Sequence, residues 1–271
     1  MAKTKRSSKS PKAPSVSKFI LNCQPSKKTE NDWKIESAEE VGLVATAAIP
    51  ASKDLRANWW TIGDQGSTGS CVGWATADSV LRWHFTKAGR LTTTQLLSPR
   101  YVWMASKETD TFTTRPTTFI ESDGTSLKGA LDIARKFGVV METVLPFGTG
   151  KLYPGSANTF YALAAQRRIA SYFNLGTVLS EWRKWIANNG PILTRLDVDA
   201  TWDNATATGG HLGVYQPNTT RGGHAVALVG YTNTGFIVRN SWGTGWGDKG
   251  FAYASDGYAH AAFTESYGVT L

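Results

Sequence analysis

Residues 64–75 have the sequence DQGSTGSCVGWA, in which a glycine- and serine-rich turn leads into an apolar run. The run keeps helical spacing through Leu81 and Phe85 and ends at Gly89, so we predict a buried helix that begins at Cys71. The first turn of a helix presents unpaired N–H groups and the positive end of the helix dipole, and both favour a thiolate over a thiol. Cys71 is therefore a candidate nucleophile.

A second pattern lies near the other end of the chain. Residues 222–231 have the sequence GGHAVALVGY and residues 236–243 the sequence FIVRNSWG, with the turn-forming residues TNTG between them. This pattern predicts a β-hairpin that brings His224, near the start of one strand, beside Asn240, at the end of the other. An asparagine oxygen can accept a hydrogen bond from one imidazole nitrogen, which leaves the other nitrogen to face a thiol. The chain thus contains a nucleophile, a base and a group that orients the base.

Taken together, these residues resemble the papain-like cysteine peptidases, in which Gln, Cys, His and Asn follow in this order. The pattern QGxxGSC at residues 65–71 has the family's spacing from glutamine to cysteine. HAV at 224–226 and NSWGxGWG at 240–247 have its spacing from histidine to asparagine. Weaker matches are DGTS at 123–126 and LPF at 145–147. The resemblance covers about residues 49–254 and does not extend to the first forty-eight.

The periodicity of the chain changes near Gly148. Helices are predicted at residues 37–41, 98–106, 126–137 and 180–188, a polar loop at 109–118, and strands at 168–173, 191–196 and 250–254. A helical half followed by a strand-rich half indicates an α+β protein. The resemblance implies the papain-like fold, in which a helical left lobe carries the cysteine helix and a β-barrel right lobe carries the histidine and asparagine.

The predicted domain boundaries follow from these patterns. Residues 1–48 are predicted to be a basic flexible tail or prosegment, and residues 49–271 a papain-like peptidase domain. Within that domain, about residues 49–165 form the helical lobe and 166–271 the barrel lobe.

The resemblance also implies a role for each site residue. Cys71 is the nucleophile, His224 the base that later protonates the leaving amine, and Asn240 the group that holds the imidazole. Gln65 and the backbone N–H of Cys71 form the oxyanion hole, and Trp242 covers the hydrogen bond between histidine and asparagine. Each of these residues, taken alone, also fits a structural role in a turn or in the core.

The other histidines are predicted to be surface or packing residues; they are His84 on the cysteine helix and His211 and His260 in loop-like sequence. The histidines and cysteines show no closely spaced pairs, which argues against a zinc site. We expect neither a metal nor another cofactor.

Three residues are weaker candidates for contact with a substrate. Gly124 lies in the glycine-rich segment, Gly223 precedes the histidine, and Arg195 falls near a position that often lines the main specificity pocket. We hypothesise that this pocket accepts an acidic or polar side chain. Thr68, where many relatives have a disulfide cysteine, and Val72, where a tryptophan is usual, indicate a bacterial-type branch without the usual disulfides.

Composition limits the class of protein. The chain has 271 residues, of which 41% are hydrophobic, so it can bury a substantial core. It contains no run of eighteen apolar residues and no secretory signal core, so we expect an intracellular protein without a transmembrane segment. Its two cysteines cannot form a disulfide framework, which also suits a reducing compartment.

The net charge of +8 resides in the tail. Residues 1–28 hold eight Lys or Arg and no acid, and the remainder has equal numbers of basic and acidic residues. We predict that this tail has no fixed structure. It either keeps the protein soluble or contacts an anionic surface. The apolar island FILNCQP at 19–25 motivates a further hypothesis, in which the island folds back over the site, blocks it and brings Cys23 near Cys71.

The function predicted from the sequence is a thiol endopeptidase that acts on peptides or proteins and is regulated by its N-terminal segment. Two alternatives stay open. One is a catalytically silent papain-like module that binds a partner, and the other is an acyltransferase that uses the same cysteine and histidine.

Overall fold

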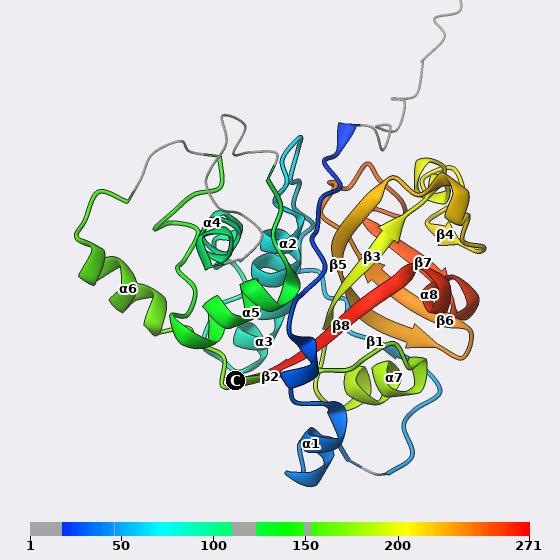
Figure 1. Cartoon of the computed structure of the whole chain (residues 1–271), viewed down its shortest axis with the longest axis horizontal. Coiled ribbons are helices and arrows are strands. Elements are labelled where there is room, and N and C mark those ends of the chain that lie inside the picture. The colour runs from blue at the N-terminus through cyan, green and yellow to red at the C-terminus, as the bar shows by residue number, and fades with distance from the viewer. Residues whose placement is uncertain (1–17, 46, 110–122, 149–152) are drawn as a thin grey trace, which may run out of the picture.

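The computed structural model describes residues 18–45, 47–109, 123–148 and 153–271. The α-helices are Ile35–Glu40 (α1), Cys71–Gly73 (α2), Arg82–Lys87 (α3), Pro99–Thr109 (α4), Leu127–Lys136 (α5), Ala157–Ala165 (α6), Leu179–Asn188 (α7) and Asp256–Ala262 (α8). The strands are Lys53–Asp54 (β1), Ser171–Asn174 (β2), Ile192–Val198 (β3), His211–Leu212 (β4), Gly222–Thr232 (β5), Gly235–Arg239 (β6), Phe251–Ser255 (β7) and Phe263–Thr270 (β8). Figure 1 shows α2 to α6 gathered in one lobe and most strands, together with α7 and α8, in a second lobe beside it. The two-lobed α+β fold predicted from the sequence is confirmed.

The helical lobe is built around the predicted cysteine helix. α2, the π-helical stretch Trp74–Leu81 (η3) and α3 follow one another without a break, and most of their side chains are buried. Gly73 lies in the first turn, where α4 crosses so closely that a Cβ would come within 2.3 Å of the carbonyl oxygen of Pro99. A glycine at this position therefore lets the two helices approach.

The strands form one mixed sheet in the order β2-β8-β3-β5-β6-β7-β4, and β1 pairs with the far part of β5. The pairs are antiparallel except for β4 with β7. β5 and β6 are the predicted hairpin, and β3 lies along β5 with Leu196 opposite His224. Among the described residues the end strands β2 and β4 do not pair, so the sheet stays open and does not close into the barrel expected.

The core has two parts, one on each side of β5. Ala225, Ala227 and Val229 face the helical lobe, and Val226 and Leu228 face the side covered by α7 and α8. This alternation follows from the period of two of a strand, and burial of both faces explains why residues 225–229 form a continuous apolar run. His224 precedes this run near the start of β5 and is also buried.

A buried charge cluster ties the cysteine helix to β6. The carboxylate of Asp78 accepts from Arg82 at 3.2 Å and from Arg239 at 2.7 Å, and all three residues are at most 5% exposed. Arg239 also donates to the hydroxyl of Ser79 and to the carbonyl of Thr61. Since Arg239 immediately precedes Asn240, this cluster joins the helix that begins at Cys71 to the strand that leads to Asn240.

Removing the acid of this cluster is expected to be costly. Asp78→Ala leaves two buried guanidinium groups without their anion, so we expect the free energy of unfolding to fall by about 3–5 kcal/mol. Urea unfolding followed by tryptophan fluorescence measures this change. Asp54→Ala is the matched control, because Asp54 pairs with Arg56 at the surface, and exposed pairs contribute about 1 kcal/mol or less. An equal loss in both variants would contradict the role assigned to Asp78.

The sequence located the helices α1 to α5 and α7 and the strands β2, β3, β5, β6 and β7 close to their observed positions. Besides the closed barrel, other predictions were wrong. His211 lies in β4 and His260 in the last turn of α8, so neither is in a loop. Residues 18–28 of the tail have defined positions against the rest of the protein. Residues 1–17 of the tail and most of the predicted loop at 109–118 lie outside the described residues.

Candidate active site

Cys71 begins α2 and is fully buried. Its sulfur is hydrogen-bonded to the thiol of Cys23 and to the backbone N–H of Ala225, and the imidazole of His224 lies close. The pKa of Cys71 lies well below its ordinary value, mainly because of the hydrogen bond with Cys23 and then because of His224, although burial alone would raise it. The surroundings of Cys71 therefore favour the thiolate.

His224, in β5, and Asn240, just after β6, meet across the hairpin. His224 Nε2 lies 2.8 Å from Asn240 Oδ1, and the same oxygen accepts the backbone N–H of Ser241 at 2.8 Å. A backbone N–H can only donate, so the amide oxygen must face it, and Nε2 then carries the hydrogen. Nδ1 is buried and has no hydrogen-bond partner of ordinary geometry among the described residues. It is the nitrogen that remains for Cys71.

Aromatic rings enclose this pair. The ring of Trp242 lies 4.8 Å from that of His224, and Trp202 approaches the imidazole edge-on at 5.7 Å. Trp242 is 2% exposed. Phe19 stacks on Trp242 with 4.3 Å between ring centroids and an interplanar angle of 2°. The hydrogen bond between histidine and asparagine is thus shielded from water, which would otherwise compete for it.

Gln65 is buried in the loop before α2. Its Oε1 accepts the hydroxyl of Ser241 at 2.9 Å, and its Nε2 donates one hydrogen to the carbonyl of Thr68 at 3.1 Å. The backbone N–H of Gln65 also donates to the carbonyl of Ser241. An amide nitrogen has two hydrogens, so one stays available after the bond to Thr68. The carbonyl of Thr68 can only accept, so it sets which end of the amide is the donor, and the hydroxyl of Ser241 holds the other end.

Residues 18–28, the covering segment, lie across these groups. Figure 1 shows the segment running between the two lobes. Cys23 N–H donates to the carbonyl of Gly223 and Gln24 N–H to that of Thr125, each at 3.0 Å. The corresponding bridges, Asn22 with Gly223 and Gln24 with Ser126, are both parallel. The segment therefore pairs with both lobes at once, directly above Cys71.

Both glycines predicted to contact a substrate contact this segment. A Cβ on Gly124 would lie 2.0 Å from the carbonyl oxygen of Asn22, and one on Gly223 would lie 2.4 Å from that of Cys23. Both distances are far shorter than real Cβ contacts. Glycine at these two positions therefore allows an extended chain to lie flat against the protein.

Arg195, on β3, lies beneath the covering segment. Its Nε donates to the carbonyl of Cys23 at 3.0 Å, its Nη1 donates to Thr264 at 2.7 Å, and its Nη2 pairs with Asp197 at 3.1 Å. The guanidinium is thus already shared between a neighbouring carboxylate and the segment. The acidic or polar preference hypothesised for this pocket stays a prediction.

The chain that follows the covering segment is anchored by a second buried cluster. The carboxylate of Asp32 accepts from Lys128 of α5 at 2.5 Å and from the hydroxyl of Tyr267 of β8 at 2.9 Å. Burial, the largest cause, lowers the pKa of Lys128, but hydrogen bonds with Asp32 and Tyr172 outweigh it, and the net shift is upward. Ile35 and Ala38 of α1 are buried against the core of the strand lobe.

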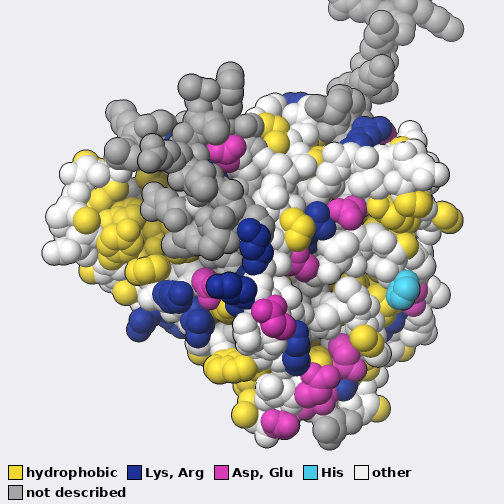
Figure 2. All heavy atoms as spheres, viewed as in Figure 1, with side chains coloured by type: hydrophobic (Ala, Val, Ile, Leu, Met, Phe, Trp, Pro, Cys, Tyr) yellow, Lys and Arg dark blue, Asp and Glu magenta, His cyan; other side chains and the backbone are white. Residues whose placement is uncertain are grey.

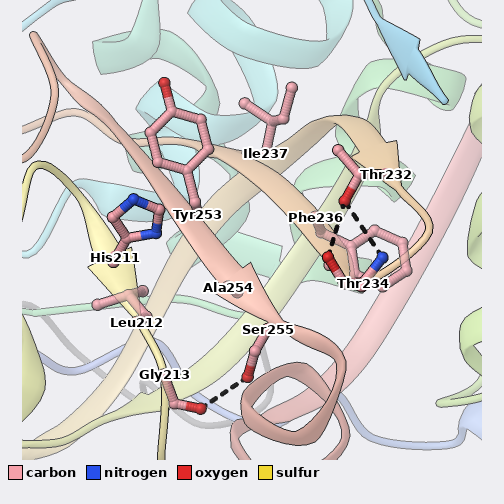
Figure 3. Close-up of a pocket in the computed structure, with 11 residues that line it drawn as sticks. His211, Leu212, Gly213, Thr232, Thr234, Phe236, Ile237, Tyr253, Ala254 and Ser255 are labelled. Atoms are coloured by element: carbon pink, nitrogen blue, oxygen red, sulfur yellow. Dashed lines mark hydrogen bonds between the residues drawn. The ribbon is translucent and has the colours of Figure 1, made fainter.

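Other surface features lie apart from these residues. Figure 3 shows a pocket of about 260 Å³ at the β4 edge of the sheet, between His211 and Tyr253 on one side and Thr232 and Phe236 on the other. No candidate site residue lines it. In Figure 2, basic and acidic side chains are interspersed over the middle of the visible face.

The described residues have neither a cluster of metal-binding side chains nor a membrane-spanning helix. No three His, Cys, Asp or Glu side chains there lie close enough together to bind a metal ion. None of the helices in the same ranges has the length and apolar character needed to cross a bilayer.

A buried thiol at a helix start, beside a histidine paired with an asparagine, on a two-lobed α+β fold, is the arrangement of the papain-like class of thiol proteases. A family model described as papain family cysteine protease matches residues 49–269, and the chain belongs to this family.

Individual relatives are distant. The cathepsin L-like proteinase of Fasciola hepatica is 24% identical over 214 residues, which cover 75% of this chain and 60% of that protein. Cysteine proteinase 2 of Leishmania pifanoi is 30% identical over 115 residues, and the match spans only 25% of its length.

Solved structures show the same fold. Xylellain, a cysteine protease from Xylella fastidiosa, has a TM-score of 0.76 at 20% identity and covers 93% of this chain and 96% of its own. Digestive procathepsin L2 from Tenebrio molitor larval midgut has a TM-score of 0.66 at 21% identity, with 97% of this chain and 81% of its own covered.

The structure thus brings Cys71, His224, Asn240, Gln65 and Trp242 together. Sequence reasoning did not identify Ser241 as the residue that orients Gln65, although it stands inside the NSWG pattern. It also did not identify the cluster of Asp78 with two arginines, because no local pattern relates residues 161 positions apart.

Proposed function

We propose that this chain is a thiol peptidase in which Cys71, His224 and Asn240 hydrolyse peptide bonds. The observation that carries the proposal is the 2.8 Å hydrogen bond between His224 Nε2 and Asn240 Oδ1, which leaves Nδ1 to a thiol of lowered pKa. Peptides or proteins are the substrates that family membership supports.

Acylation begins when the Cys71 thiolate attacks the carbonyl carbon of the scissile bond. The carbonyl oxygen becomes an oxyanion, which accepts hydrogen bonds from the backbone N–H of Cys71 and from the free N–H of Gln65. His224, protonated at Nδ1, gives this proton to the leaving amine. Water then attacks the thioester, with His224 as the base, and the acid product leaves. Asn240 keeps the ring in one orientation throughout.

Gln65 supplies a donor that no neighbour replaces. Gln65→Glu keeps the shape of the side chain but removes the N–H, so we expect kcat to fall by roughly 10²–10³-fold, or about 3 kcal/mol in the transition state. Hydrolysis of a fluorogenic peptide library by a chain that starts at Lys28 measures this effect. Ser241→Ala, which only releases the amide, is expected to lower kcat less. If Gln65→Glu has an unchanged kcat, the oxyanion role fails.

Covalent labelling tests the proposal without knowledge of the substrate. A cysteine-directed epoxide is expected to modify Cys71 in the chain that starts at Lys28 and to leave Cys71→Ala unmodified. This chain lacks Cys23, whose hydrogen bond is the largest cause of the lowered pKa of Cys71, but the contact with His224 also lowers that pKa. Labelling is therefore still expected to continue as the pH falls below the ordinary thiol range. Mass spectrometry identifies the modified residue. Absence of labelling together with absence of hydrolysis would favour the silent binding module instead.

The same proposal includes inhibition by the covering segment. Its backbone occupies the carbonyl groups of Gly223 and Thr125, with which an extended peptide would otherwise pair. Its carbonyl at Cys23 is held by Arg195, and its thiol lies against Cys71. The nucleophile therefore meets a side chain where a substrate would offer a carbonyl carbon, so the segment blocks the site and resists cleavage.

A further inference from the structure

We infer that Cys23 and Cys71 form a reversible disulfide under oxidation by a peroxide, and that this bond locks the covering segment over the site. The inference rests on the proposed function, because the locked residue is the proposed nucleophile. It adds a covalent and redox-dependent state to the non-covalent inhibition described above.

Geometry brings the two sulfurs together. Both cysteines are free and lie in the same buried core cluster, and they are the two cysteines of the whole chain. The thiol of Cys23 points to the carbonyl of Gln24 at 3.9 Å and is close enough to Cys71 for each thiol to shift the pKa of the other. Cys71 is held by the helix that it begins. The backbone of Cys23 is held on both sides of its Cα: its N–H donates to the carbonyl of Gly223, and its carbonyl accepts from Arg195 Nε. A disulfide requires close Cβ atoms with little strain in the backbone, and here both backbones are fixed with the thiols already in contact.

The two thiols differ in a way that suits this chemistry. The pKa of Cys71 is lowered, whereas burial, followed by the contact with Cys71, raises the pKa of Cys23. The thiolate is the form that attacks an oxidant, so Cys71 is the residue oxidised first. Cys23 keeps its proton until it reacts. Cys71 is therefore the peroxidatic thiol of the pair and Cys23 the resolving thiol.

The reaction balances with hydrogen peroxide as the oxidant. When the segment lifts, the Cys71 thiolate attacks one peroxide oxygen, so that an S–O bond forms, the O–O bond breaks, and the leaving hydroxide takes a proton to become water. When the segment returns, the Cys23 sulfur attacks the sulfenic sulfur of Cys71. An S–S bond forms, the S–O bond breaks, and hydroxide leaves as water with the proton of Cys23. Two thiols lose two electrons in total, and one peroxide becomes two waters.

The disulfide would serve two purposes. It converts a segment held by hydrogen bonds and the stack of Phe19 on Trp242 into one held covalently, so the oxidised protein stays inhibited. It also stops Cys71 at an oxidation state that a thiol reductant reverses, before the irreversible sulfinic and sulfonic acids form. Thiol–disulfide exchange with a dithiol then restores both cysteines.

Mass spectrometry of the full chain tests the inference. After treatment with stoichiometric hydrogen peroxide and alkylation, we expect the intact mass to be lower than that of the untreated, unalkylated protein by two hydrogen atoms. We also expect one cross-linked peptide pair that contains Cys23 and Cys71, and its loss after dithiothreitol. Cys23→Ser is the matched control, since it keeps the size of the side chain but removes the sulfur. Sulfinic acid needs two equivalents of peroxide and sulfonic acid three, so this variant and the wild type are also compared in a several-fold excess of hydrogen peroxide. There we expect the variant to form sulfinic or sulfonic acid at Cys71 that dithiothreitol does not reverse.

Two results separate this inference from the proposed function. If peroxide leaves Cys23 open to alkylation while Cys71 becomes sulfinic acid in the wild type, the inference is wrong, whatever the peptidase activity. If the cross-link forms and is reversible, but the chain that starts at Lys28 neither hydrolyses peptides nor takes the epoxide, the disulfide stands and the proposed function fails. A wild type and a Cys23→Ser variant that oxidise alike would also overturn the inference.

Discussion

Cys71→Ala, made in the chain that starts at Lys28, is expected to lower kcat for peptide hydrolysis by about five to six orders of magnitude, as loss of the nucleophile of a catalytic unit does. The methyl group cannot form the thioester, and the oxyanion donors alone stabilise only part of the transition state. The measurement is steady-state hydrolysis of a fluorogenic peptide, with active sites counted by epoxide titration.

His224→Ala is expected to cost nearly as much as Cys71→Ala, and the double variant little more than either, because residues that act as one unit are not additive. His211→Ala is the matched control. His211 is exposed at the pocket of Figure 3 and contacts none of the candidate site residues, so its kcat should be unchanged. Similar losses in the two histidine variants, or a Cys71→Ala variant with substantial activity, would contradict the assignment.

Removal of the covering segment is expected to raise activity. A chain that starts at Lys28 should have a kcat/KM at least about tenfold above that of the full chain. If the covered state is favoured over the open state by only about 1.4 kcal/mol, about one full-length molecule in ten is open to substrate, whereas every shortened molecule is open. The anchors that follow it stay in place, since Asp32 keeps its bonds to Lys128 and Tyr267 and α1 keeps its packing. Peptide hydrolysis at equal concentrations of folded protein measures the difference.

The matched control for this deletion is a chain that starts at Lys18. It lacks the residues before the covering segment but keeps Phe19 and Cys23, so its activity should equal that of the full chain. Phe19→Ala in the full chain should raise activity part of the way, because it removes the stack on Trp242 while the backbone pairs to Gly223 and Thr125 remain. Equal activity in the chains that start at Lys18 and Lys28 would exclude inhibition by the segment.

The proposed site could be located from the sequence because its residues stand in short patterns. Cys71 follows a turn and opens an apolar helix, and that order of residue types sets its place at a helix start. His224 and Asn240 are sixteen positions apart at the open end of one hairpin, so local turn chemistry brings them together. The helix α5 was likewise identifiable, because its apolar residues Leu127, Ala130, Leu131 and Ala134 recur at helical spacing and Gly138 follows it.

Other parts could not be found in this way. The strand β8 and the helix α8 went unrecognised, because Gly257 and Gly268 interrupt their patterns. The closed barrel was expected from the resemblance, whereas the pairing in the structure leaves β2 and β4 apart. The residues before Lys28 were predicted to lack fixed structure on composition, yet Phe19 and Cys23 are buried. Composition shows how much apolar surface a segment could bury by itself. It does not show that another part of the chain provides a surface against which the segment can pack.

Local sequence was sufficient for the elements that carry the candidate site, for its histidine–asparagine pair and for the helix that presents the thiol, because these depend on residues near one another in the chain. Contacts between distant residues required the folded chain. They include Arg239 on Asp78, the hydroxyl of Ser241 on Gln65, and the thiol of Cys23 on Cys71. Such contacts arise when two lobes and an extended segment pack together. Their energies depend on burial of these groups by parts of the chain that are distant in sequence, so no single stretch of sequence predicts them.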